Sequence, residues 1–274
     1  MPETKKMIGV LVPTLESVST TRLIMTMHRV LKEKGYKDIV MFTDHGIDEK
    51  DCVEEMLKIG VQGLVVLPGN TKAAHVKMVN ELDIPIVFVG QKVDEGNYII
   101  YDDYMAGCTI GEYMASSFDF SNYLFIGVSE EHESVGVRRK QGVYTALQDR
   151  GVEKISFLET DFTYETAAEK IHNYLQNHKP DAIICATDRI AMACYKELTA
   201  MGWKIPEEVS LAGFGGYTLT QLMSPSLTTV RYPNEMAGIL AGEMIAELIE
   251  GKTDIENHKI LDYQLLEGGS VKHK

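Results

Sequence analysis

Short apolar runs alternate with amphipathic segments along almost the whole chain. Residues 8–12 form a β-rich apolar run that ends at Pro13, and apolar side chains then recur at helical spacing from Leu23 to Leu31. Near-continuous apolar strands separated by amphipathic helices predict a parallel sheet with helices on both faces. The same pattern predicts further strands at 38–42, 63–67 and 84–89, and further helices at 49–59 and 73–82.

A second run with the same alternation begins near Asn122. No Ser/Gly-rich or low-complexity linker divides the two runs. We therefore expect an α/β protein with two Rossmann-like halves, joined by short crossovers that leave a ligand cleft between them. The second run predicts strands at 123–128, 154–158, 182–186 and 209–213, helices at 137–149, 167–175, 190–201 and 236–248, and a strand pair at 260–266.

Polar and aromatic side chains gather where the predicted strands end. In open α/β sheets, ligands bind beyond the carboxyl ends of the strands. The segments at these ends are rich in hydroxyl, carboxylate, guanidinium and aromatic groups, a mixture that suits a polyhydroxylated ligand. They comprise residues 13–20, 68–71, 90–91, 129–139, 160–163, 187–188 and 214–217.

The charge balance of the 274-residue chain is acidic. It has 27 Lys and Arg against 40 Asp and Glu, which gives a formal net charge of −13. Because duplex DNA is bound by clustered Lys and Arg, this balance argues against DNA binding by the chain on its own. The sequence has neither an apolar run of the ~20 residues that a membrane span needs nor the apolar stretch of a signal peptide. We expect a cytoplasmic protein without membrane contact.

Patterns of catalysis and metal binding are missing from the sequence. There is no GxGxxG after the first strand, no P-loop and no nucleophile elbow, and the eight histidines have no metal-ligand spacing. The four cysteines form no CxxC pair and lie in apolar segments, which favours buried reduced thiols over disulfides or metal ligands. We therefore expect no metal, no cofactor and no enzymatic activity.

Two charged clusters leave alternatives open. Asp102 and Asp103 could be paired catalytic carboxylates, but neighbouring side chains diverge, which favours a helix N-cap for one and a ligand contact for the other. The basic cluster 138–140 is either a solvated face or, because it opens a helix at the predicted cleft, the source of a ligand-binding arginine.

Seven motifs, in their order and spacing, are similar to one protein family. The chain resembles the effector-binding core of the lactose/galactose-repressor (LacI/GalR) family of bacterial transcription regulators. Pro-Glu-Glu-Val-Ser at 206–210 and Ser-Leu-Thr-Thr-Val at 226–230 favour the repressors over the periplasmic sugar-binding proteins that share the fold. The motifs lie at 8–13, 61–66, 102–107, 136–142, 186–192, 205–214 and 225–230.

The resemblance implies a periplasmic-binding-protein-like type I fold, with two subdomains around a sugar-sized cleft and three crossovers. We expect an N-terminal subdomain of residues 6–117 plus 232–252 and a C-terminal subdomain of residues 118–231 plus 253–270. The family implies a sugar-sensing repressor in which the cleft ligand allosterically modulates operator binding. Asp102 and Arg139 would then contact the ligand from different halves.

The family further implies a homodimer, with helical faces around 23–31 and 78–82 as candidates for part of its interface. Its DNA-binding helix-turn-helix headpiece does not precede the first predicted strand, so operator DNA would be a partner only through a headpiece missing from this chain. The competing hypothesis is a sugar-binding protein of an ABC transporter.

The resemblance also implies ligand contacts at specific positions. Asp102 matches the family's carboxylate on the sugar hydroxyls, Arg139 the arginine that clamps them, and Phe162 the aromatic residue that stacks on the ligand. From the residues alone, Phe162 could instead be core, Thr187 or Asp188 an N-cap, and Asp102 a hinge residue. The expected ligand-binding residues are Ser17, Ser19, Thr20, Asp102, Arg139, Phe162, Thr187, Asp188 and Gly215.

One departure from the family pattern follows Gly213-Phe214. The family usually has two aspartates next, of which the first hydrogen-bonds the sugar, whereas Gly215 and Gly216 stand here. A carboxylate acceptor is lost and the backbone gains room, so either another residue supplies the contact or the ligand is bulkier, such as a disaccharide or sugar phosphate. Gly-Phe-Gly-Gly-Tyr is also similar to the sucrose-operon repressors of Gram-positive bacteria.

Overall fold

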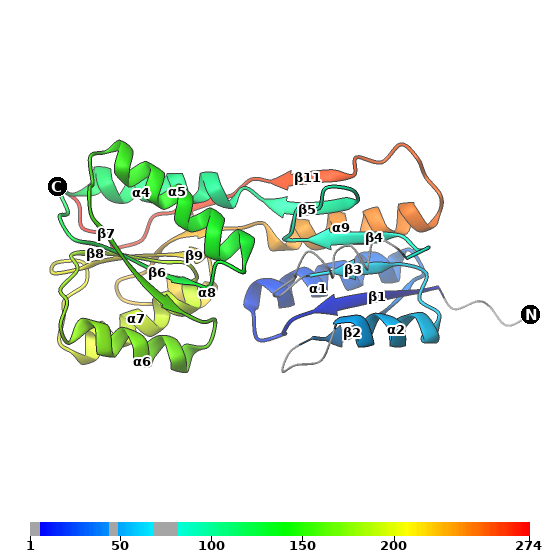
Figure 1. The fold of residues 1–274 in the computed structure, drawn as a ribbon, viewed down its shortest axis with the longest axis horizontal. Helices are drawn as coiled ribbons and strands as arrows, with labels where there is room; N and C mark the ends of the chain where they lie inside the picture. Colours follow the sequence, from blue (N-terminus) through cyan, green and yellow to red (C-terminus); the bar gives the residue numbers. More distant parts are fainter. Residues whose placement is uncertain (1–5, 44–48, 68–81) are drawn as a thin grey trace, which may run out of the picture. The chain divides into compact units, whose positions relative to one another are not determined.

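The chain forms two compact units, each with its own six-stranded sheet (Figure 1). The computed structural model describes residues 6–43, 49–67 and 82–274. Unit 1 comprises Met1–Tyr101 and Pro233–Asp262, and unit 2 comprises Asp102–Tyr232 and Tyr263–Lys274. The chain therefore passes between the units after Tyr101, after Tyr232 and after Asp262. The predicted α/β fold with two parallel-sheet subdomains is confirmed.

Unit 1 has a parallel sheet with strand order β11-β5-β4-β3-β1-β2. Alternate residues along each strand face opposite sides, so Val10 and Val65 pack with α1 and α9 while Leu11 and Val66 pack with α2. The elements are β1 (Met7–Val12), α1 (Val18–Glu33), β2 (Lys37–Phe42), α2 (Glu49–Ile59), β3 (Leu64–Val66), β4 (Ile86–Val89), β5 (Asn97–Tyr101), α9 (Asn234–Ile249) and β11 (His258–Leu261).

Helix α1 contains one candidate for the dimer interface, residues 23–31, and part of this segment packs inside unit 1. Leu23, Met27 and Leu31 are buried in one cluster with Ala241 and Ile245 of α9. Leu23, Met27 and Leu31 are therefore not available to a second chain, whereas Met25 of the same helix is 64% exposed, so the dimer-interface candidate at 23–31 stays a prediction. The other candidate face, 78–82, and the predicted helix 73–82 lie outside the described residues except for position 82.

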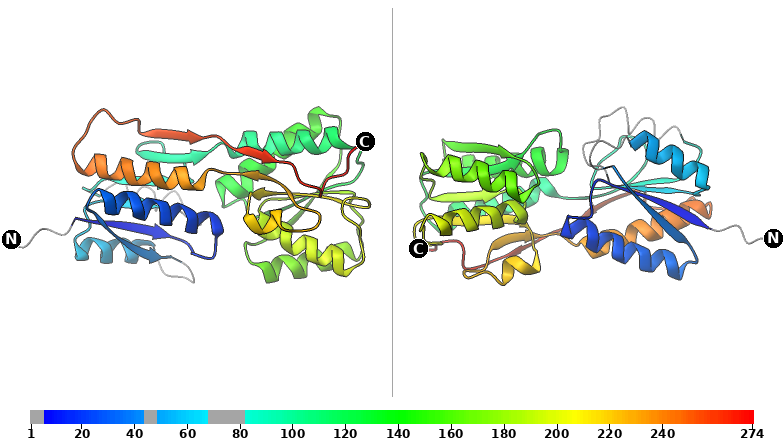
Figure 2. Two further views of the ribbon diagram at one scale, coloured as in Figure 1. Left: turned by 180° about the vertical axis from the view of Figure 1, so that it is seen from behind. Right: turned by 90° about the horizontal axis from the view of Figure 1, so that it is seen from below.

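Unit 2 has the strand order β12-β10-β9-β8-β6-β7, in which only β12 is antiparallel to its neighbour. The views in Figures 1 and 2 show α4 and α5 on one face of this sheet and α6 and α7 on the other. The elements are α4 (Asp103–Ser117), β6 (Tyr123–Val128), the π-helical η2 (Glu133–Arg138), α5 (Arg139–Asp149), β7 (Ile155–Thr160), α6 (Tyr164–Leu175), β8 (Ala182–Cys185), α7 (Asp188–Ala200), β9 (Ser210–Gly215), α8 (Thr218–Gln221), β10 (Thr228–Arg231) and β12 (Gln264–Leu266).

Helix α4 belongs to unit 2 because it crosses α5 at backbone contact. A Cβ atom at Gly107 would lie 2.4 Å from the Arg139 carbonyl oxygen, and one at Gly142 would lie 2.1 Å from the Tyr104 carbonyl oxygen. The first crossing between the units therefore comes at 101/102 rather than at the expected 117/118. Asp102 consequently lies in the same unit as Arg139, and the expectation that the two residues belong to different halves is wrong.

The C-terminal strands do not pair with each other, contrary to the prediction for 260–266. β11 pairs with β5 in unit 1, and β12 pairs with β10 in unit 2. The alternation in the sequence located both strands but carried no information about their partners.

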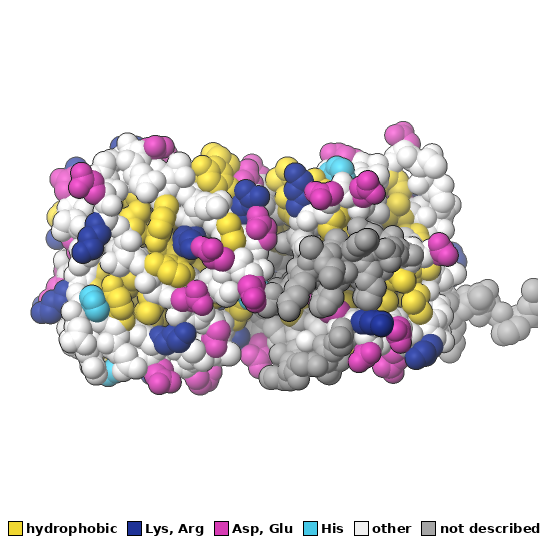
Figure 3. All heavy atoms as spheres, in the orientation of Figure 1, with side chains coloured by type: hydrophobic (Ala, Val, Ile, Leu, Met, Phe, Trp, Pro, Cys, Tyr) yellow, Lys and Arg dark blue, Asp and Glu magenta, His cyan; other side chains and the backbone are white. Residues whose placement is uncertain are grey.

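The surface and the thiols agree with the composition. Figure 3 shows acidic and basic side chains interspersed on the face that it displays. All four cysteines are free thiols; Cys52, Cys185 and Cys194 are buried as predicted, whereas Cys108 is only half-buried. In the part of the chain that the structure describes, no helix is both long enough and apolar enough to cross a membrane.

Candidate functional site

Arg139 is the centre of a buried polar cluster in unit 2. It is the first residue of α5 and is 8% exposed. Its Nε donates to Asp103 Oδ1 at 2.7 Å, and its Nη1 donates to the carbonyl oxygen of Ala186, directly after β8, at 2.8 Å. The charge of Arg139 is therefore balanced by α4, while its orientation is fixed at the carboxyl end of the sheet.

Two aromatic rings enclose this ion pair. The Arg139 Cζ atom lies 4.7 Å from the ring centre of Tyr232 and 5.3 Å from that of Phe214. The Tyr232 hydroxyl donates to Asp103 Oδ1 at 2.7 Å. Burial opposes the charge on Arg139, but its interactions with Tyr232 and Asp103 outweigh this effect and raise the pKa of the guanidinium. Burial also raises the pKa of Tyr232, so this residue is a neutral hydrogen-bond donor at pH 7.

Asp188 fastens the segment after β9 to the start of α7. Its fully buried carboxylate accepts from Thr229 Oγ1 at 2.6 Å, from the Tyr217 backbone N–H at 2.8 Å and from Thr220 Oγ1 at 3.3 Å. Burial raises the pKa of Asp188, although these donors and Arg139 act in the opposite direction. A carboxylate has about four acceptor sites, so most of its capacity is used within unit 2.

Gly215 and Gly216 form a close turn against other parts of unit 2. Gly216 has φ +62°, and a Cβ there would lie 2.8 Å from the Arg231 Cα atom. Gly215 has φ +149°, and a Cβ there would lie 2.8 Å from Cε1 of Tyr217 and 3.1 Å from Cγ of Asp188. The ring of Tyr217 thus occupies the volume into which a side chain at 215 would project.

The capping alternatives apply to several predicted site residues. Asp102 caps α4 and accepts from the Met105 N–H at 3.1 Å, so its neighbour Asp103, not Asp102, is the partner of Arg139. Thr187 caps α7, accepting from the Ile190 N–H at 3.2 Å. Phe162 is 36% exposed and its ring lies edge-on to that of His132 at 4.8 Å between centres, so the core alternative is wrong for Phe162.

The predicted first loop belongs to unit 1. Ser17 caps α1 and accepts from the Thr20 N–H at 3.3 Å, and Ser19 lies in the first turn of the same helix. Within unit 2 the structure brings Arg139, Asp188 and Gly215 together. Tyr217 is the residue that reasoning from the sequence did not single out. The sequence feature that could have indicated Tyr217 is its position directly after two glycines at the end of a strand.

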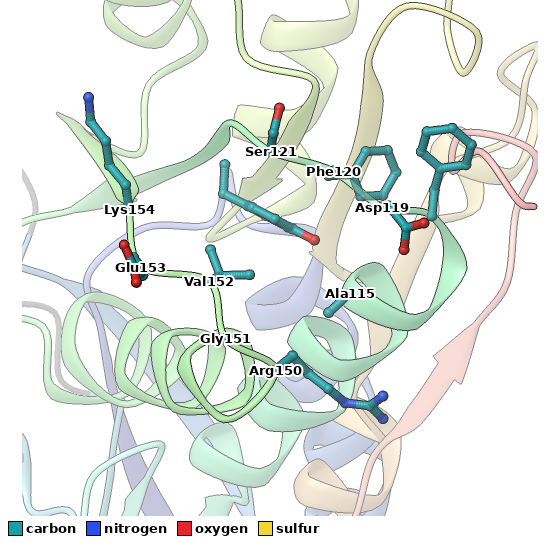
Figure 4. A pocket seen from close by; sticks show the side chains of 11 residues that line it. Ala115, Asp119, Phe120, Ser121, Arg150, Gly151, Val152, Glu153 and Lys154 are labelled. Atoms are coloured by element: carbon teal, nitrogen blue, oxygen red, sulfur yellow. The ribbon is translucent and has the colours of Figure 1, made fainter.

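A hollow at the amino-terminal ends of the unit 2 strands does not resemble a ligand site (Figure 4). It has a volume of about 470 Å³ and lies beside the starts of β6 and β7. Figure 4 shows Lys154 and Arg150 extending away from each other, and Arg150 is paired with Glu112 at 2.6 Å. Because its charged groups do not converge, this hollow lacks the polar arrangement of a small-molecule site.

Comparison with known proteins assigns the chain to a family. The sequence pattern of the periplasmic binding protein-like domain matches residues 119–271. The sucrose operon repressor of Staphylococcus xylosus is 30% identical over 260 residues, which cover 94% of this chain and 80% of the repressor. The chain belongs to the LacI/GalR family. It corresponds to the effector-binding core of these transcription regulators, and the arabinose metabolism transcriptional repressor of Geobacillus stearothermophilus is a further relative, 24% identical and covering 90% of this chain and 71% of the repressor.

Solved structures of LacI/GalR proteins share the fold. A LacI family transcriptional regulator from Enterococcus faecium with bound ribose has a TM-score of 0.88 at 21% identity, covering 98% of this chain and all of that one. The transcriptional regulator CelR in complex with cellobiose has a TM-score of 0.86 at 20% identity, covering 97% of this chain and 85% of that one. These relatives are regulators rather than enzymes, and the comparisons give no support to the ABC-transporter alternative.

Proposed function

We propose that this effector-binding core senses a small sugar and binds it at the carboxyl ends of the unit 2 strands. The observation that carries the proposal is its likeness to the sucrose operon repressor over 94% of the chain. Arg139, Asp188 and the segment after β9 converge at the carboxyl ends of these strands. This supports the proposal, because open α/β sheets bind ligands at the carboxyl ends of their strands.

Arg139 is proposed as the main ligand donor. A guanidinium has five N–H donors, and the bonds to Asp103 and Ala186 account for two of them. The remaining donors suit neighbouring sugar hydroxyls, which a planar guanidinium can contact in pairs. Asp102, Thr187, Asp188, Phe162 and Gly215 remain proposed ligand contacts in unit 2, and Ser17, Ser19 and Thr20 in unit 1.

The connections of Arg139 offer a route for regulation. Asp103 is the second residue after the first crossing between the units, and Tyr232 is the last residue before the second. Both contact Arg139, so a ligand that alters the guanidinium also acts on two crossovers. Such an effect shifts a conformational equilibrium only if the ligand binds the two states differently. We propose that this response modulates operator binding by a headpiece in a cytoplasmic homodimer.

Isothermal titration calorimetry with ribose, arabinose, sucrose and cellobiose tests the sugar proposal. We expect at least one sugar to bind the chain, and we expect Arg139→Lys to lower the affinity for that sugar at least about tenfold. Lysine keeps the charge but loses the planar fork of donors. Arg138→Lys is the matched control, because the side chain of Arg138, the residue next to Arg139, is 53% exposed and is paired with Glu133.

Thermal unfolding of both variants separates binding from folding. A ligand at 100 times its Kd stabilises the folded chain by about 2.7 kcal/mol, so the sugar that binds should also raise the Tm. A folded Arg139→Lys protein that binds the sugar as tightly as the wild type would refute the role of Arg139. The absence of binding by the wild type to all four sugars would refute the sugar proposal.

A further inference from the structure

We propose that Tyr217 determines ligand specificity, by placing an aromatic ring over Gly215 where the site would otherwise hold a side chain of residue 215. This inference rests on the proposed sugar-binding function at the carboxyl ends of the unit 2 strands. It identifies a residue and a ligand class: a neutral sugar whose ring lies against the Tyr217 ring.

The position of Tyr217 is fixed from two sides. Its backbone N–H donates to Asp188 at 2.8 Å, which anchors the residue to the start of α7. Its Cε1 and Cδ1 atoms lie 2.8 and 3.1 Å from the place of a Cβ at Gly215, which orients the ring over the end of β9. The glycine and the tyrosine therefore act as a pair, because the ring needs the absence of a side chain at 215.

The surroundings of Tyr217 favour an uncharged ligand. The residue is half-buried, and it is close enough to Arg139 to contribute to raising the pKa of the guanidinium. Two buried carboxylates, Asp103 and Asp188, accompany this buried guanidinium, whereas Arg231 beside Gly216 is exposed. A phosphate group added here would meet an excess of negative charge, whereas the apolar face of a neutral sugar can lie on an aromatic ring and its hydroxyls can bond to Arg139.

The test is calorimetry on the wild type, Tyr217→Phe, Tyr217→Ala and Gly215→Ala with ribose, arabinose, sucrose, cellobiose and glucose 6-phosphate. We expect the wild type to prefer a neutral sugar, and Tyr217→Ala to weaken the affinity for that sugar about tenfold, because the substitution removes the aromatic contact. Gly215→Ala should also lower the affinity for this sugar. Tyr217 is still present in this variant, but the added Cβ displaces its ring.

The double variant Gly215→Ala, Tyr217→Ala separates this role from general damage. If both residues act through the ring, the two losses of affinity do not add, whereas independent losses would overturn the pairing. Tyr195→Phe is the control, since that hydroxyl donates to the Ser224 carbonyl oxygen in another part of unit 2. Its affinities should equal those of the wild type.

The outcomes distinguish the inference from the proposed function. If the wild type binds a neutral sugar and folded Tyr217→Phe and Tyr217→Ala keep its affinity and the ranking of all five probes, this inference is refuted and the proposed function stands. Preference of the wild type for glucose 6-phosphate over the neutral sugars would also refute it. If the wild type binds no probe, the proposed function fails and this inference fails with it.

Discussion

The environment of Arg139 illustrates how one buried charge can join several segments. Its guanidinium contacts α4 through Asp103, the end of β8 through Ala186 and the rings of Phe214 and Tyr232. A buried ion pair gains little over an apolar pair, but the loss of one partner leaves an uncompensated charge. The cluster therefore makes unit 2 sensitive to changes at any of its members.

Asp103→Asn tests this sensitivity at the residue scale. The variant keeps the shape of the side chain but removes the charge that balances Arg139, so we expect a loss of about 3 kcal/mol in the free energy of unfolding. Urea denaturation followed by circular dichroism measures the change. Glu112→Gln is the control, because its pair with Arg150 is exposed, with 63% of the Glu112 side chain accessible, and should cost less than about 1 kcal/mol. Equal losses for the two variants would contradict the account.

At the level of elements, the crossing of α4 and α5 depends on two glycines. Gly107 and Gly142 let the helix backbones approach until carbonyl oxygens occupy the space of a side chain. This packing keeps Asp102 and Asp103 beside the start of α5. It also places the residues after the first crossover in unit 2, next to the candidate site.

Gly142→Ala should disrupt this crossing. Its Cβ atom would lie 2.1 Å from the Tyr104 carbonyl oxygen, and such overpacking against backbone costs about 2–3 kcal/mol. The free energy of unfolding from urea titrations measures this effect. Gln141→Ala, an exposed neighbour on the same helix, should change the value by no more than about 0.5 kcal/mol. A wild-type stability for Gly142→Ala would show that the helices can separate without cost.

The elements that are local in sequence were predictable, and those defined by distant partners were not. The continuous apolar runs located β1 and β6, and the period-3.6 pattern located α7, each to within a few residues. The pattern could not show that β11 and β12 join different sheets, because pairing partners lie far away in the chain.

The candidate site shows the same division. Arg139 and Asp188 were predictable as residues at strand ends, and the structure brings them together with Gly215. The choice between Asp102 and Asp103 required the position of α4 relative to α5, which neither residue type nor spacing reveals. Tyr217 was missed as an individual residue because its importance depends on the empty volume over Gly215.

The acidic charge of the whole chain has a direct functional test. With a net charge of −13, the effector-binding core should not retain duplex DNA, since polyanion binding needs clustered cations to displace counterions. We expect no shift of a 20-base-pair duplex in a gel retardation assay at about 50 mM salt, with or without the sugar that binds. Retention that weakens steeply with added salt would reveal a basic surface that the net charge conceals.

The three crossings between the units also affect how the protein is made. Unit 1 needs residues 233–262 in addition to its first segment, and unit 2 needs residues 263–274. On the ribosome, neither sheet can gain its last strand until β11 and β12 have emerged, although nearly all of both cores has already been synthesised. Premature termination before His258 would therefore release a chain with two exposed sheet edges, and such edges promote aggregation.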